Sequence, residues 1–73
     1  MGNSVYSKEY QNVIKRLKEA RIESGLKQEE VAERLGKPQS YVSKIERGER
    51  RVDIAEVKLF AKLYQKPIDF FVK

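Results

Sequence analysis

Residues 28–48 read QEEVAERLGKPQSYVSKIERG, and the other helices expected in this chain are arranged around this stretch. Apolar side chains recur every three or four residues on both sides of Gly36-Lys37-Pro38, which predicts two short helices joined by a tight turn. Glycine readily takes the left-handed conformation that ends a helix, and proline suits the opening of the next one. The stretch therefore predicts a helix, a turn and a second helix.

The second of these helices, near Gln39 to Arg47, divides into two faces at about 100° per residue. One face is apolar and consists of Tyr41, Val42 and Ile45. The other face is polar and consists of Gln39, Ser40, Ser43, Lys44 and Arg47. It contains amides, hydroxyls and cations but no carboxylate, and such groups bond to base edges and phosphates. The pattern favours a helix that contacts DNA.

The composition limits the kinds of protein that this chain can be. Its 73 residues suffice for one small domain, near the lower limit of what a single core can stabilise unaided. Since it has no cysteine and no histidine, disulfides and the usual zinc sites are excluded, and we expect no metal and no cofactor. The net charge of +5 favours a polyanionic partner. No apolar run has the length of a membrane span and no signal-peptide core is present, so we expect a cytoplasmic protein.

The N-terminal part of the chain predicts one further helix. Residues 1–6 are expected to form a flexible segment, so that the domain proper spans residues 7–73. Ser7 is placed to cap a helix that Gly25 ends. The apolar positions of this helix are Tyr10, Val13, Ile14, Leu17 and Ala20. Lys15 and Lys18 read as members of its solvated face, whereas Arg21 lies near the end of the apolar positions and can point inward.

The C-terminal part predicts two more helices. Asp53 and Glu56 match an acidic variant of the capping box, which predicts the start of a fourth helix. Its expected core side chains are Val57, Phe60, Ala61 and Tyr64. Leu59 and Leu63 form a second apolar row, which lies either under the chain terminus or in a surface for self-association. A last short helix is expected from Pro67. Because no strand pattern is found, we expect an all-α, compact five-helix domain.

The stretch from Gln28 to Asp53 resembles the helix-turn-helix of the Cro/C1-type, or Xre, family of bacterial and phage regulators. The resemblance rests on residues at the spacing of that family: Gln28, Ala32, Gly36, Gln39, Ser40, Ser43, Glu46 and Gly48. It extends over residues 14–72 and implies the lambda-repressor-like fold, whose third helix enters the major groove. Two positions depart from the family pattern, since Lys27 replaces a frequent capping residue and Pro38 a frequent small hydroxyl residue.

The resemblance also implies roles for individual residues. The base contacts are assigned to Gln39, Ser40, Ser43 and Lys44. The phosphate contacts are assigned to Lys27, Gln28, Tyr41, Arg47, Arg50 and Arg51. Gln28 is expected to brace Gln39, and an ion pair is expected between Arg21 and Glu46. Simpler roles stay open: Lys44 can reach a phosphate, the serines can merely permit close approach, the loop arginines can be ordinary surface cations, and Tyr41 is mainly a packing residue.

Two classes of function follow. The first is a sequence-specific regulator of transcription, a repressor or autoregulator, that binds double-stranded DNA at a palindromic operator as a homodimer. Its candidate dimer surface consists of Leu59, Leu63 and Phe70. The second is a protein-interaction adaptor or antitoxin-like partner that retains the fold. We expect no enzyme and no small-molecule substrate, because the chain lacks histidine, cysteine and a phosphate-cradling glycine loop. We expect no membrane partner, because no apolar run has the length of a membrane span.

Overall fold

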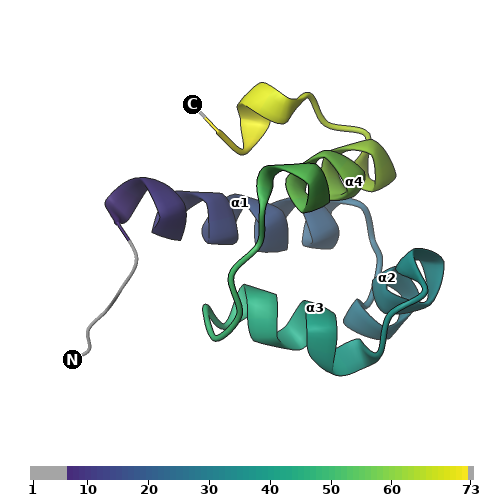
Figure 1. Ribbon diagram of the computed structural model, residues 1–73. Coiled ribbons are helices and arrows are strands. Elements are labelled where there is room, and N and C mark those ends of the chain that lie inside the picture. Colours follow the sequence, from purple (N-terminus) through teal and green to yellow (C-terminus); the bar gives the residue numbers. More distant parts are fainter. Residues whose placement is uncertain (1–6, 73) are drawn as a thin grey trace.

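The computed structural model describes residues 7–72, and this range forms helices and turns without a strand (Figure 1). The α-helices are α1 (Lys8–Glu23), α2 (Gln28–Leu35), α3 (Gln39–Glu46) and α4 (Ile54–Tyr64), and a 3-10 turn, η1, covers Ile68–Phe70. The flexible segment expected at residues 1–6 lies outside the described residues. Within the described range no helix is both long and apolar enough to cross a membrane.

Three helix ends form at the signals that the sequence predicts. The Ser7 hydroxyl accepts a hydrogen bond from the Tyr10 backbone N–H at 3.1 Å and caps α1. Gly36 ends α2 with a φ of 69°, a conformation that glycine adopts at little cost. At the start of α4, Asp53 and Glu56 exchange backbone-to-carboxylate hydrogen bonds of 2.9 and 2.8 Å. These contacts confirm the predicted caps of α1 and α4 and the predicted end of α2.

The start of α2 uses a cap that the sequence analysis missed. Lys27 is the N-cap residue, and its ammonium group cannot accept a hydrogen bond from the helix. The carboxylate of Glu30, three residues later, accepts a hydrogen bond from the Lys27 backbone N–H at 2.7 Å. This contact is one half of a capping box, and it satisfies a backbone donor that would otherwise lack a partner in the helix.

The last short helix predicted from Pro67 forms as the 3-10 turn η1, so the chain has four α-helices and this turn rather than five clear helices within the described residues. Its hydrogen bonds run from the Phe70 N–H to the Pro67 carbonyl and from the Phe71 N–H to the Ile68 carbonyl, both at 3.0 Å. The Phe71 side chain that follows is fully buried. The tighter winding of a 3-10 turn accommodates this burial within very few residues, so the packing of Phe71 sets the local conformation.

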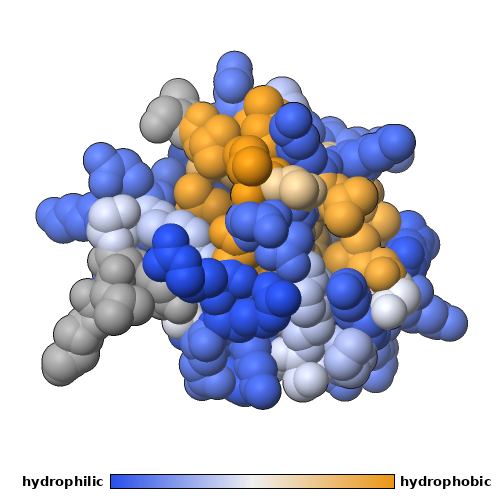
Figure 2. Space-filling view, viewed as in Figure 1, coloured by the Kyte–Doolittle hydropathy of each residue, from blue (hydrophilic) through white to orange (hydrophobic). Residues whose placement is uncertain are grey.

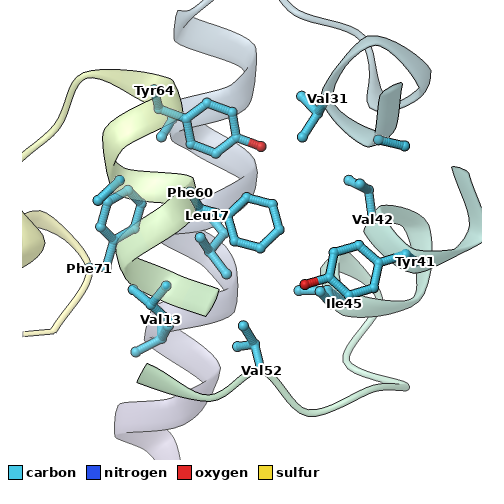
Figure 3. Packing of buried hydrophobic residues seen from close by; sticks show 14 residues of the cluster. Val13, Leu17, Val31, Tyr41, Val42, Ile45, Val52, Phe60, Tyr64 and Phe71 are labelled. Carbon is cyan, nitrogen blue, oxygen red and sulfur yellow. The ribbon is translucent and has the colours of Figure 1, made fainter. Parts of the chain in front are cut away.

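One hydrophobic cluster connects all four helices (Figure 3). Its fully buried side chains include Leu17 of α1, Val31 of α2, and Val42 and Ile45 of α3, together with Phe71. The four positions predicted for the core of α4 are all buried, namely Val57, Phe60, Ala61 and Tyr64. The cluster also takes in the loop residue Val52, which the sequence analysis did not include in the core.

The helix α3 lies along one edge of the molecule, at the bottom of Figure 1, whereas η1 lies at the opposite edge. The helices α1 and α2 pack directly against α3. Since its apolar face is covered by this core, α3 directs its polar face away from the rest of the protein.

Candidate nucleic-acid interface

The outer face of α3 carries the four side chains for which base contacts are predicted. Gln39, Ser40 and Lys44 are exposed, and Ser43 is half-buried. Within residues 7–72, none of these four side chains takes part in a hydrogen bond or an ion pair. Their amide, hydroxyl and ammonium groups are therefore available to a ligand.

The inner face and the preceding turn hold α3 in position. Val42 and Ile45 are each 1% exposed, and Tyr41 is buried as well. The backbone N–H of Lys37 donates to the Ala32 carbonyl at 2.9 Å, which closes the end of α2 around the left-handed Gly36. The turn and the core together set the orientation of α3 relative to α2, so the outer face is presented by a rigid support.

An ion pair ties the end of α3 to α1. Arg21 donates from Nε to Glu46 Oε2 at 2.7 Å and from Nη2 to Oε1 at 3.2 Å. Its Nη1 donates to the Leu26 carbonyl at 2.9 Å. The side chains are only 13% and 5% exposed, so the pair is largely withdrawn from water. The structure thus brings together Arg21 and Glu46, and it leaves α3 without an uncompensated carboxylate at this position.

The predicted bracing of Gln39 by Gln28 is absent from the contacts of the described residues. The Gln28 amide instead donates from Nε2 to Glu46 Oε1 at 2.9 Å. A carboxylate is a stronger acceptor than an amide oxygen, and Glu46 lies within reach of the start of α2. Gln28 is therefore part of a network with Arg21 and Glu46 that joins α1, α2 and α3.

The predicted phosphate-contacting arginines lie after α3, and two of them already bind carboxylates. Arg47 donates from Nε and Nη2 to the two carboxylate oxygens of Glu49 at 3.1 and 3.2 Å. Arg50 donates from Nη1 to Glu56 at 3.3 Å. The guanidinium of Arg51 lies 5.1 Å from the centre of the Tyr10 ring. All three arginines are exposed, but the loop is less basic than its arginine content suggests.

Tyr41 is predicted to contact phosphate as a secondary role, but its hydroxyl points to a neighbouring carboxylate. The hydroxyl donates to Glu56 Oε2 at 2.7 Å, and burial together with this bond raises the pKa of Tyr41 to about 12. Burial alone raises the pKa of Glu56, but hydrogen bonds from the Asp53 backbone and Tyr41, together with the charge of Arg50, leave it below 4.5. Tyr41 therefore packs α3 against α4.

The remaining predicted site residues lie elsewhere on the surface. Lys27 is exposed at the start of α2. Leu59 is 56% exposed, and Leu63 and Phe70 are half-buried. Apolar side chains gather over α4 and η1 in the upper part of Figure 2, whereas the surface over α3 is hydrophilic. Two cations also lie near the Phe70 ring, with the Arg16 guanidinium at 5.0 Å and the Lys66 ammonium at 4.8 Å from its centre.

Residues 17–71 match the family model of a helix-turn-helix. The DNA-binding domain of BldD is similar in structure, with a TM-score of 0.78 and 25% identity over 93% of this chain and 100% of that one. The wild-type restriction-modification controller protein C.Esp1396I gives a TM-score of 0.78 and 30% identity, over 90% of this chain and 86% of that one. The restriction-modification controller protein C.AhdI from Aeromonas hydrophila gives a TM-score of 0.76 and 30% identity, over 90% of this chain and 98% of that one. No curated protein matches the chain significantly by sequence.

Proposed function

Because this chain belongs to the helix-turn-helix family of Cro/C1-type, or Xre, regulators, we propose that it binds a palindromic DNA operator as a homodimer and represses transcription there. The observation that carries this proposal is the outer face of α3. Gln39, Ser40 and Lys44 are exposed there, and within the described part of the protein neither they nor the half-buried Ser43 make a side-chain hydrogen bond or ion pair. The inner face is fixed by the core. An α-helix presented in this way fits the major groove of B-DNA.

The side chains of this face have the chemistry of base recognition. The oxygen of the Gln39 amide can accept a hydrogen bond from adenine N6–H while its nitrogen donates to adenine N7. The Lys44 ammonium can donate to guanine O6 and N7, or to a phosphate when it extends further. Ser40 and Ser43 are short, so they allow close approach of the helix and can add hydroxyl bonds. Adenine opposite Gln39 is therefore the base preference that we propose first.

Cations beside this face supply the proposed phosphate contacts. Lys27 is exposed at the start of α2, and Arg47, Arg50 and Arg51 are exposed after α3. Such contacts carry little sequence information, but they supply much of the affinity and make it dependent on salt. We therefore propose that these cations bind the phosphate backbone of the DNA, while Gln39 and its neighbours on α3 recognise the base sequence.

The proposed dimer surface consists of Leu59 and Leu63 of α4 and of Phe70 in η1. Leu59 and Leu63 are four residues apart in α4, so they lie on the same side of that helix. This part of the molecule lies away from α3, and pairing through it leaves the outer face of α3 open. Two copies would then contact two half-sites about 34 Å apart, which is one turn of DNA.

The proposal is tested by selecting bound sequences from a random duplex pool. We expect a palindromic consensus with an adenine that Gln39→Ala ceases to select, at a loss of about 1–3 kcal/mol of discrimination per half-site. Asn12→Ala is the matched control, since Asn12 is an exposed amide on α1. If no sequence is enriched from the pool, sequence-specific binding is rejected. If the protein shows no salt-dependent binding to any duplex DNA, the protein-interaction adaptor is favoured instead.

A further inference from the structure

The segment that follows α3 contains as many carboxylates as arginines. Residues 47–56 read RGERRVDIAE, with Arg47, Arg50 and Arg51 opposed by Glu49, Asp53 and Glu56. A segment meant only to attract phosphate would gain from fewer acids, because like charges repel. Two of these carboxylates bind the arginines proposed for phosphate contact, so the acids alter the very groups that would hold DNA.

The contact between Glu49 and Arg47 has the geometry of a phosphate contact. Both carboxylate oxygens of Glu49 accept from the guanidinium, at 3.1 Å from Nε and 3.2 Å from Nη2. A phosphate uses the same paired donors, so it and the Glu49 carboxylate compete for one site. The two side chains are 57% and 55% exposed, so the contact can open without disturbing the core.

The backbone holds Glu49 in this position. Gly48 has a φ of 78°, and the Glu49 N–H donates to the Lys44 carbonyl at 2.8 Å, which closes the end of α3. A left-handed glycine followed by such a bond is the usual way in which a helix end is fixed. Glu49 is thus placed beside Arg47 by the same turn that ends α3.

Glu56 is different, because it has structural tasks besides binding Arg50. It accepts hydrogen bonds from the Tyr41 hydroxyl at 2.7 Å and from the Asp53 backbone at 2.9 Å. Replacing Glu56 would therefore disturb the cap of α4 and the packing of α3. Glu49 makes no such contact through its side chain in the described structure, so its effect on DNA binding can be separated from stability.

From these contacts we infer that Glu49 is a specificity-determining residue, which withholds Arg47 from the backbone of random DNA by occupying its guanidinium. The inference rests on the proposed function. On random duplex the protein is held loosely, so no fixed phosphate draws Arg47 away from Glu49. On the operator, base contacts by α3 hold a phosphate next to Arg47, and the phosphate replaces the carboxylate. Glu49 therefore lowers binding to random DNA more than binding to the operator.

The inference is tested with Glu49→Gln, which keeps the size of the side chain and removes its charge. Freeing one phosphate contact steepens the plot of log K against log salt by about 0.9 and raises binding to random duplex about eightfold at 0.1 M salt. Operator binding should gain less, so the ratio of operator to random affinity falls several-fold. The control is Glu33→Gln on α2, an exposed site with the same change in net charge, which should leave that ratio unchanged.

The test is completed by introducing Arg47→Ala into the wild-type protein and into the Glu49→Gln variant. On random duplex this substitution should cost little in the wild type, where Glu49 occupies Arg47, but should remove the whole gain of Glu49→Gln. If Glu49→Gln behaves like Glu33→Gln, or if its gain survives Arg47→Ala, the role of Glu49 is rejected while the proposed function stands. If the wild-type protein shows no salt-dependent binding to any duplex, the proposed function fails, and the inference fails with it. Thermal melting of each variant verifies that it is folded.

Discussion

The ion pair between Arg21 and Glu46 gives the sharpest prediction about stability. In Glu46→Ala, Arg21 loses the partners of its Nε and Nη2, and Gln28 loses the acceptor of its amide. The guanidinium stays poorly exposed, with only its bond to the Leu26 carbonyl, because its side chain is 13% exposed in the wild type. Stranding a buried charge in this way costs about 3–5 kcal/mol.

This cost is large for a chain of 73 residues, since domains of this size are often stable by only about 3–5 kcal/mol. With about 4–8 °C of melting temperature lost per kcal/mol in small domains, we expect Glu46→Ala to melt at least about 12 °C lower or to be unfolded at 25 °C. Circular dichroism at 222 nm during heating and in urea measures both outcomes.

A matched control is Glu19→Ala, which removes the same side chain from an exposed pair. Arg16 and Glu19 lie 3.5 Å apart, and their side chains are 37% and 40% exposed. Such a pair contributes about 0.3–0.5 kcal/mol, so this variant should melt within a few degrees of the wild type. If Glu46→Ala melts as close to the wild type as Glu19→Ala does, the argument that the buried pair anchors α3 is refuted.

Three further predictions concern α4 and its contacts. Gln65 has a φ of 57°, so Gln65→Gly should relieve strain and raise stability by about 0.5–1 kcal/mol in urea unfolding. The pKa of Glu56 lies below its ordinary 4.5, so the ionised carboxylate contributes fully to folding stability above pH 4.5, and this contribution is lost as the pH falls through the lower folded pKa. The stability of Glu56→Gln should therefore depend less on pH in that window than the stability of the wild type does. If the stability of Glu56→Gln depends on acid pH in the same way as that of the wild type, the hydrogen bonds of Glu56 do not stabilise the fold as argued. Leu59→Glu should turn the proposed dimer into a monomer in sedimentation without unfolding it, because Leu59 is 56% exposed.

Much of the fold can be predicted from interactions between residues that are close together in the sequence. The predicted core positions of α4 are all buried, because a spacing of three and four residues places them on one side of any helix. Gly36 and the capping pair of Asp53 and Glu56 lie where predicted, since each acts within one helical turn. A short helix from Pro67 was predicted, but its 3-10 winding was not, because the burial of Phe71 in the core decides that winding.

The candidate site divides in the same way. The amphipathic spacing of residues 39–47 by itself specifies which side chains lie on the polar face of α3, because the identity of a helical face depends only on local geometry. The partners of the charged residues depend on how the helices pack. Glu46 meets an arginine 25 positions earlier, and the Tyr41 hydroxyl meets a carboxylate 15 positions later. Distances across such separations are set by packing of the core, so only the tertiary structure decides which charges are already bound and which are available to DNA.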